Sequence, residues 1–243
     1  MINNVFIWGS KSYALLVDDL ISNYKTSLNL SLLNSNKQKL KSKFIFDPYS
    51  KSKNRTNFKG SFFSEIKRFR NNIKNCNSFV VCIGNNNGKA RYSVSKFLER
   101  FSLTPINLIS RYSLILKKTK IGVGVVAMPF SYVNSFSTIG DYTILNSNSN
   151  IEHECVIGKG CHIMSGACIA GRNVIGNFVT IGSNSTILPD ISIGDGAYIG
   201  AGAVVTKNVK RNSIIVGNPG KHVKINKHLY DDKILKKILA FKK

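Results

Sequence analysis

Residues 139–163 read IGDYTILNSNSNIEHECVIGKGCHI, and a branched aliphatic residue returns at every sixth position of this stretch. The spacing extends in both directions and links thirteen aliphatic positions: Val133, Ile139, Leu145, Ile151, Ile157, Ile163, Ile169, Ile175, Ile181, Ile187, Ile193, Ile199 and Val205. The residue four positions after each of these is mostly small: Ser137, Thr143, Ser149, Cys155, Cys161, Ala167, Asn173, Val179, Ser185, Ile191, Ala197, Ala203 and Val209. A period of six fits neither an α-helix nor a heptad repeat.

This period is typical of short strands joined by tight bends. Glycine often follows the aliphatic residue, as at Gly140, Gly158 and Gly176, and it relieves the backbone where φ must be unusual. Three such strands would close one triangular coil of eighteen residues, with the aliphatic side chains stacked in columns inside. Each coil would bury its apolar residues only against its neighbours. Ordinary hairpins would have variable spacing, so we predict a β-helix.

Charge is distributed unevenly along the chain. The protein has 35 Lys and Arg and 12 Asp and Glu, a net charge of +23. Residues 1–120 hold 22 basic and 5 acidic groups, residues 121–205 hold 2 and 5, and residues 206–243 hold 11 and 2. Such a basic excess suits nucleic acid, a membrane surface or a phosphorylated ligand. We expect three parts: residues 1–120, residues 121–220 and a basic tail at 221–243.

The cysteines and the apolar segments indicate the compartment. The five cysteines are Cys76, Cys82, Cys155, Cys161 and Cys168. They are odd in number and form no C-x-x-C pair, so they indicate neither a disulfide framework nor a zinc ribbon. No apolar run approaches the roughly 20 residues that span a bilayer, and the N-terminus lacks the basic-then-apolar order of a signal peptide. We expect a cytoplasmic protein with reduced thiols.

Several short motifs carry a family resemblance. They are ILN at 144–146, IEHECVIG at 151–158, SGA at 165–167, ILP at 187–189 and GNPGK at 217–221. With them the chain resembles the hexapeptide-repeat sugar acyltransferases, of the sialic acid O-acetyltransferase and UDP-bacillosamine-pathway N-acetyltransferase type. The resemblance covers about residues 1–225 and is strong after residue 120. It implies a left-handed β-helix, a homotrimer with active sites between subunits, acetyl-CoA as co-substrate, and no metal.

Acetyl transfer needs a base to take the acceptor's proton. The chain has four histidines, of which only His153 and His162 lie in the repeat. Neither occupies an inward column, so both should face outward or into an interface. The resemblance implies that His153 is the base and that Asn146 lies near it. Glu154 follows His153 directly, and a carboxylate beside an imidazole favours its protonated form.

The resemblance also implies a binding site for acetyl-CoA. It assigns contacts to His162, near the thioester, and to Ser183 and Ala201, which lie eighteen residues apart in one outward column of small residues. Gly171 would offer a backbone N–H, and Lys221 would meet the phosphates of CoA.

The N-terminal region has the pattern of an α/β unit. Residues 5–8 predict a strand and residues 14–21 a helix, and further strands are predicted at 43–46 and 79–83. The first turn has only one glycine, so a dinucleotide fingerprint is absent. The loops after the three strands should meet at one edge of a Rossmann-like sheet, where ligands bind. The resemblance implies that a nucleotide-sugar is held there by Lys11, Ser12, Tyr13, Asp47, Gly84 and Asn85.

Two acetyl transfers fit these residues: N-acetylation of a nucleotide-linked amino sugar, which we favour, and O-acetylation of a sugar such as sialic acid. A γ-type carbonic anhydrase would want three zinc histidines, and the repeat has two. A nucleic-acid binder would explain the charge but not the IEHE motif. The tail at 221–243 predicts a basic helix that packs on the trimer or, less readily, contacts a membrane surface.

Overall fold

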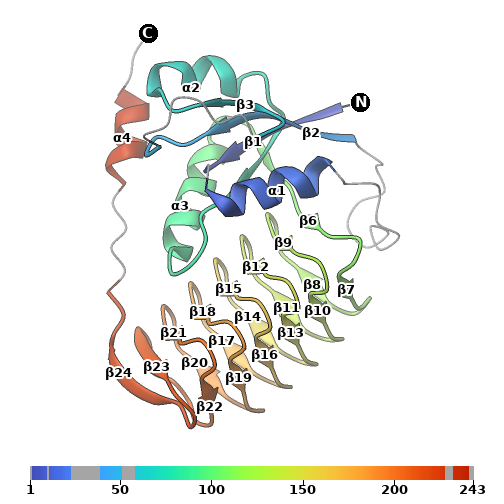
Figure 1. Cartoon of the computed structure of the whole chain (residues 1–243), viewed down its shortest axis with the longest axis vertical. Coiled ribbons are helices and arrows are strands. Elements are labelled where there is room, and N and C mark those ends of the chain that lie inside the picture. The colour runs from blue at the N-terminus through green and yellow to red at the C-terminus, as the bar shows by residue number, and fades with distance from the viewer. Residues whose placement is uncertain (1, 10, 23–38, 51–57, 228–231, 241–243) are drawn as a thin grey trace.

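The computed structural model describes residues 2–9, 11–22, 39–50, 58–227 and 232–240. An α/β domain lies against one side of a β-helix, and the last helix of the chain returns to the α/β domain (Figure 1). Within the described residues no helix is long and apolar enough to cross a membrane. Much of the polar segment at 31–59 lies outside the described residues, as do Ser10 and His228.

Five parallel strands form the sheet of the α/β domain, in the order β3-β2-β1-β4-β5. They are β1 (Ile2–Trp8), β2 (Lys39–Phe46), β3 (Ser61–Phe63), β4 (Ser78–Val81) and β5 (Thr104–Pro105). The helices are α1 (Ser12–Ser22), α2 (Ile66–Ile73), α3 (Gly88–Glu99) and α4 (Lys233–Ala240). The predicted strands and first helix are all present, although β1 and β2 begin earlier than expected and β4 ends earlier.

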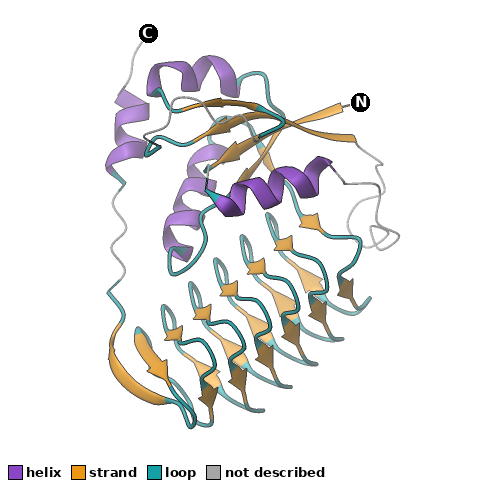
Figure 2. Ribbon diagram, in the orientation of Figure 1, coloured by secondary structure: helices purple, strands orange, loops and turns teal. Residues whose placement is uncertain are grey.

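The two faces of the sheet bury different clusters because successive side chains of a strand alternate in direction. Phe6 and Trp8 of β1 pack among aromatic residues on the face covered by α2, α3 and α4. Val5 and Ile7 pack on the opposite face with residues of α1 and with Leu108 of the β-helix. Helix α1 therefore lies between the sheet and the β-helix (Figure 2).

Three parallel sheets form the sides of the β-helix. The domain-facing sheet contains β6 (Leu108–Ile109), β9 (Val126–Ala127), β12 (Ile144–Leu145), β15 (His162–Ile163), β18 (Thr180–Ile181), β21 (Tyr198–Ile199), β23 (Ser213–Val216) and β24 (Lys221–Ile225). The second sheet contains β7 (Leu114–Ile115), β10 (Tyr132–Val133), β13 (Asn150–Ile151), β16 (Cys168–Ile169), β19 (Thr186–Ile187) and β22 (Val204–Val205). The third contains β8 (Lys120–Ile121), β11 (Thr138–Ile139), β14 (Val156–Ile157), β17 (Val174–Ile175) and β20 (Ser192–Ile193).

The register of the repeat is the one predicted. Strands pair across eighteen residues, as Leu145 with Ile163 and Ile163 with Ile181. All thirteen aliphatic residues of the series are at most 2% exposed, and the residues four positions after them are buried as well.

The corner after a domain-facing strand is called the first corner, for example residues 146–149. The corner after a second-sheet strand is called the second corner, for example residues 152–155. The third corner leads back to the domain-facing sheet.

The ends of the β-helix differ from the expected boundaries. Its strands begin at Leu108, before residue 121. At the other end, residues 221–225 form strand β24, antiparallel to β23, rather than the start of a helix. The only helix in the described part of the tail is α4. Its residues Leu235 and Ile238 are buried in the α/β domain, so its apolar face packs within the chain.

Helix α3 joins the two units. Gly88 at its start approaches the third corner so closely that a Cβ there would lie 2.1 Å from the carbonyl oxygen of Gly160. The ring of Tyr92 meets Tyr142 and Phe178 edge-on, with centroids 5.7 Å away in each case. Glycine at 88 and an aromatic residue at 92 thus set how closely the two units pack.

Candidate active site

A cavity of about 890 Å³ opens where the α/β domain meets the β-helix. It lies at the carboxyl ends of β1 and β4, where the strand order of the sheet reverses and α/β folds bind ligands. Its lining includes all six residues predicted to hold the acceptor: Lys11, Ser12, Tyr13, Asp47, Gly84 and Asn85. The β-helix contributes Asn146, His162 and Met164. The cavity therefore brings residues of both units into one site.

The backbone after β1 is drawn close to the end of β4. Gly9 has a φ of 115°, and a Cβ there would lie 2.8 Å from the carbonyl oxygen of Cys82. Glycine at this position lets the chain turn into α1, whose first residue is Ser12. Lys11 and the start of α1 thus face the cavity with positive charge, which suits a phosphate group. At the end of β2, Asp47 accepts a hydrogen bond on Oδ1 from the backbone N–H of Tyr49, at 2.9 Å.

The hydroxyl of Tyr13 is buried and has no hydrogen-bond partner among the described residues, although the residue lines the cavity. Burial also raises the pKa of Tyr13, so the hydroxyl is protonated and can donate. A buried hydroxyl without a partner is costly, by roughly 1–3 kcal/mol.

His162 and Asn146 form a hydrogen-bonded pair on the β-helix side of the cavity. Nε2 of His162 lies 3.3 Å from Nδ2 of Asn146, and Nδ1 lies 3.4 Å from the carbonyl oxygen of Asn85. Because a carbonyl only accepts, Nδ1 carries the proton and Nε2 accepts from the Asn146 amide. Burial and the charge of Arg91 lower the pKa of His162 to about 3, which keeps the ring neutral near pH 7. His162 thus faces an interface within the chain, and both its ring nitrogens are engaged there.

Arg91 of α3 fastens the two sides of the cavity together. Its guanidinium donates to the carbonyl oxygens of Tyr142 at 2.8 Å, Gly160 at 2.8 Å and Cys161 at 2.9 Å, and also to that of Ile83. The side chain is 2% exposed, and burial lowers its pKa to about 10, so it stays charged at neutral pH. Ile83 precedes the Gly84–Asn85 turn and Cys161 precedes His162. Arg91 therefore fixes the spacing between these two walls.

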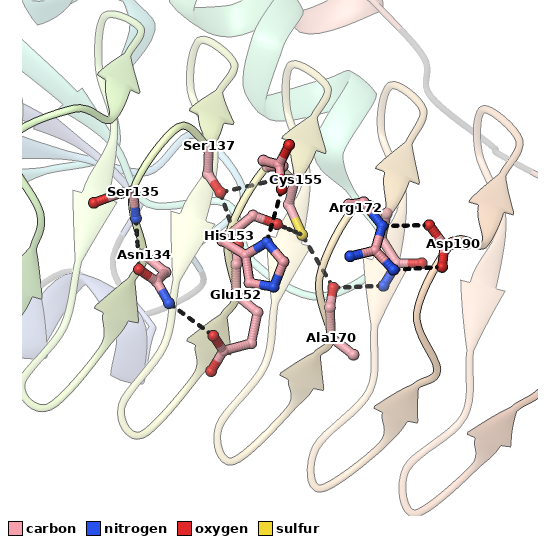
Figure 3. A network of polar contacts seen from close by, with 11 residues as sticks. Asn134, Ser135, Ser137, Glu152, His153, Cys155, Ala170, Arg172 and Asp190 are labelled. Atoms are coloured by element: carbon pink, nitrogen blue, oxygen red, sulfur yellow. Dashed lines mark hydrogen bonds and ion pairs between the residues drawn. The ribbon is translucent and has the colours of Figure 1, made fainter.

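The predicted base lies elsewhere, on the second corner of the β-helix (Figure 3). Nδ1 of His153 is 3.0 Å from Oε2 of Glu154. Since a carboxylate accepts, the proton sits on Nδ1 and Nε2 carries the free lone pair. A Cβ at Gly171, one coil further on, would lie 2.6 Å from Nε2 of His153. Glycine at 171 thus lets the imidazole of His153 lie directly against the next coil.

A charged pair lies on the second corners of the coils that follow His153. Arg172 donates two hydrogen bonds to the Asp190 carboxylate, each 2.7 Å long, and its backbone N–H donates to the carbonyl oxygen of His153 at 2.9 Å (Figure 3). The pair is exposed, so it adds little stability by itself. Its backbone contact helps to hold the corner on which the imidazole is mounted.

Ser183 and Ala201 stack on the first corner, as the register predicts. The N–H of Gly202 donates to the carbonyl oxygen of Ser183 at 2.8 Å, which aligns the two successive coils. Ala201 and Lys221 are exposed and Ser183 is partly so. None of these three, and neither His153 nor Glu154, lines the cavity.

The predicted site residues therefore do not all meet within one chain, since Ser183, Ala201 and Lys221 lie apart from the cavity and from the second corner. Asn146 and His162 join the acceptor residues in the cavity, whereas His153, Glu154 and Gly171 lie together on the second corner. Within the chain Asn146 contacts His162 and not the predicted base. Among the described residues no cluster of three or more His, Cys, Asp or Glu side chains could hold a metal ion.

Sequence reasoning missed several residues of the cavity. Arg91 was not singled out, although Arg91, Val94, Ser95 and Leu98 recur with helical spacing and would have indicated a buried face of α3. Met164 lies two positions after His162, so it shares that outward side of the coil. Ile234 of the tail also lines the cavity, and no local signal in the sequence indicates this.

Comparison with known proteins supports the architecture. Residues 137–171 and 174–207 match the family described as "Bacterial transferase hexapeptide (six repeats)". A mutant of perosamine N-acetyltransferase from Caulobacter crescentus, in complex with CoA and GDP-perosamine, is similar in structure: TM-score 0.76, 20% identity, covering 92% of this chain and 98% of that one. The acetyltransferase domain of PglB from Neisseria gonorrhoeae FA1090 has TM-score 0.75 and 19% identity, covering 91% and 100%. WeeI from Acinetobacter baumannii AYE has TM-score 0.72 and 24% identity, covering 92% and 100%.

These likenesses extend over both units of the chain. The fold is a Rossmann-like domain followed by a left-handed parallel β-helix of hexapeptide repeats, as the sequence predicts.

Proposed function

We propose that this protein transfers the acetyl group of acetyl-CoA to the amine of a nucleotide-linked amino sugar. The observation that carries the proposal is the cavity in which the six predicted acceptor residues meet Asn146 and His162 of the β-helix. The complex of the perosamine N-acetyltransferase with CoA and GDP-perosamine supports the same pair of substrates on the same fold. The PglB domain has likewise been crystallised with acetyl coenzyme A.

The cavity suits an acceptor with three chemically different parts. Lys11 and the start of α1 would meet the diphosphate, and Asp47 would accept a hydrogen bond from the base. The sugar would then lie toward Gly84, Asn85 and Asn146. Tyr13 would form part of the wall between these ends.

The chemistry needs no covalent enzyme intermediate. The acceptor nitrogen attacks the thioester carbonyl carbon, and Nε2 of His153 takes the proton that the nitrogen loses. Glu154 stabilises the imidazolium that forms, through its contact with Nδ1. The tetrahedral oxyanion then collapses, the C–S bond breaks, and the CoA thiolate leaves and takes up the proton from His153. A positioned general base of this kind contributes typically about 10²–10⁴-fold.

The separation of the two residue groups argues for a site shared between subunits. His153 does not line the cavity of its own chain, so a second copy would have to present its second corner to that cavity. A homotrimer of β-helices would do this three times by symmetry. The pantetheine arm would run along the small first-corner column at Ser183 and Ala201, with Lys221 near the phosphates and His162 near the thioester end.

An acceptor screen tests the proposed activity. Purified protein, acetyl-CoA and a thiol reporter are combined with nucleotide-linked amino sugars, with sialic acid and with no acceptor. We expect CoA release only with an amino sugar linked to a nucleotide. Release with sialic acid instead would favour O-acetylation, and release with no acceptor class would contradict an acetyltransferase.

Complementation tests the shared site. Chains carrying His153→Ala and chains carrying Asn146→Ala are each expected to be nearly inactive. When the two variants are coexpressed, they would form mixed trimers. Some sites would then combine an intact His153 from one chain with an intact cavity from another. Activity should then return in part. Mixed trimers as inactive as the two parents would contradict a site that two subunits share.

A further inference from the structure

The C-terminal helix α4 is anchored to the α/β domain from far along the chain. Its buried residues Leu235 and Ile238 join the aromatic cluster on the α2 and α3 face of the sheet. Nη2 of Arg70 in α2 donates to the carbonyl oxygen of Leu239 at 3.2 Å. Helix α4 therefore lies beside α2, across the α/β domain from α1 (Figure 1).

One residue of this helix reaches the cavity. Ile234 lines it and packs against the same cluster as Trp8 and Val94, which also line it. The ring of Trp8 lies 5.0 Å from that of Phe46, the residue before Asp47. Ile234 thus packs with the cluster that contains Trp8 and Val94, whereas Asn146 and His162 come from the β-helix.

The chemistry of this end differs from that of the other. Trp8, Val94 and Ile234 are apolar, and Asp47 is the acidic residue that lines the same cavity. Apolar walls with one carboxylate suit the flat face and the N–H groups of a nucleobase. They carry no positive charge for a phosphate.

We propose that helix α4 is a specificity element of the acceptor site, in which Ile234 forms one wall of the nucleoside-binding end. This inference rests on the proposed function for the identity of the acceptor. It gives the basic tail a role: its apolar residues Leu235 and Ile238 dock the helix, and docking presents Ile234 to the nucleoside.

The test compares Ile234→Ala with Leu239→Ala. Both remove similar apolar volume from α4, but the Leu239 side chain is exposed and does not line the cavity. Binding of UDP, GDP and inorganic pyrophosphate is measured by calorimetry on the full-length protein. Circular dichroism checks that both variants keep the helix.

Ile234→Ala should lower the affinity for the preferred nucleoside diphosphate by about fivefold to tenfold, because a few methylene contacts are lost. Pyrophosphate binding and the KM for acetyl-CoA should not change, and Leu239→Ala should behave as wild type. Unchanged nucleoside diphosphate binding in Ile234→Ala would overturn the proposal, as would an equal loss for pyrophosphate.

A second variant, Leu235→Asp, undocks the helix by burying a charge. It should lose nucleoside diphosphate affinity at least as strongly as Ile234→Ala while the β-helix stays folded. Wild-type affinity in Leu235→Asp with α4 displaced would overturn the proposal.

The two proposals fail separately. A wild type that binds nucleoside diphosphate through Ile234 but releases no CoA with any acceptor contradicts only the acetyl transfer. If the wild type acetylates a nucleotide sugar and Ile234→Ala has the same KM for that sugar, only the role of α4 is contradicted.

Discussion

The β-helix and the α/β domain bury their cores through contacts of different range. In the β-helix the strands before β23 pair with strands eighteen residues away, and the same inward apolar position recurs from coil to coil. In the α/β domain Ile7 of the central strand pairs with Ile45 on one side and with Val80 on the other, so the core depends on segments far apart in sequence. In the first arrangement the inward positions alone form the core, so the outward positions can carry different side chains in each coil. The second brings unlike loops to one edge, where a binding site can form.

The largest effect should come from breaking a column of the β-helix. Ile199 is fully buried between Ile181 and Ile215, so Ile199→Asp buries an unpaired charge and should cost more than about 4 kcal/mol in the free energy of unfolding. Thermal unfolding followed by circular dichroism checks this.

Ala201 lies two residues further on but is exposed, and it provides the matched control. Ala201→Phe should melt near the wild type while its KM for acetyl-CoA rises and acceptor binding survives. If Ala201→Phe melts like Ile199→Asp, the assigned register is wrong. If it folds and uses acetyl-CoA normally, the first corner is not the CoA groove.

The next effect concerns an outward position of the same frame. His153→Ala should lower kcat by about 10²–10⁴-fold and change the affinity for acetyl-CoA little, since it removes only the base. Steady-state kinetics and equilibrium binding measure the two quantities. His222→Ala, at another exposed histidine of the β-helix, serves as the control. A His153→Ala enzyme with wild-type turnover would exclude this residue as the base.

The third effect concerns the joint between the two regions. Arg91→Met removes the donor from the carbonyl oxygens of Tyr142, Gly160 and Ile83, whereas that of Cys161 still accepts from the N–H of Ile144. The change should cost about 3 kcal/mol in stability, judged from the usual penalty for unsatisfied buried groups. The KM for the acceptor should also rise, because the two walls of the cavity lose their fixed spacing. Lys89→Met removes an exposed cation from the same helix and should change stability by less than about 0.5 kcal/mol. Equal effects of the two variants would contradict the clamp.

The smallest effect is a dependence of stability on pH. In the folded protein burial and Arg91 lower the pKa of His162 to about 3, whereas an unfolded histidine titrates near ~6.5. Between these values the unfolded chain binds a proton that the folded chain does not. The stability associated with neutral His162 is therefore complete above about pH 6.5 and is lost as the pH falls, by up to about 1.4 kcal/mol per pH unit.

Urea unfolding at about pH 7 and about pH 5 measures this dependence. His162→Gln, which cannot be protonated, should lose less stability on acidification than the wild type. Other groups titrate in both proteins, so only the difference between the two slopes reports on His162. Identical slopes would contradict a neutral, buried His162.

The sequence predicted the β-helix in detail because each coil meets only its neighbours. The environment of Ile163 is set by Leu145 and Ile181, and the period of eighteen identifies both. Of the five strands of the α/β domain, β3 and β5 were not predicted, whereas β1, β2 and β4 were recognisable from local pattern. Their bounds were less so, because a strand such as β2 extends as far as its partners allow.

The joint and the tail could not be predicted in this way. Arg91 gains its role only when α3 lies against the third corner, and nothing near Arg91 in the sequence specifies Tyr142 or Gly160. Helix α4 was recognisable as amphipathic, but the surface it packs on is set by α2 and the aromatic cluster. The resemblance also implied that Asn146 lies near His153, and within one chain the two residues lie on different corners.

Strand β24 runs antiparallel to β23, while every other pairing in the β-helix is parallel among the described strands. A parallel coil that simply stopped would present an open ladder of backbone groups on which the first coil of another molecule could continue, and stacking could repeat without limit into a filament. Reversing the last strand offers that ladder in the wrong direction, and the exposed Lys221 and Lys224 on it repel a second copy. The reversed strand therefore closes the domain-facing sheet against further stacking, whereas the second and third sheets end on the parallel strands β22 and β20.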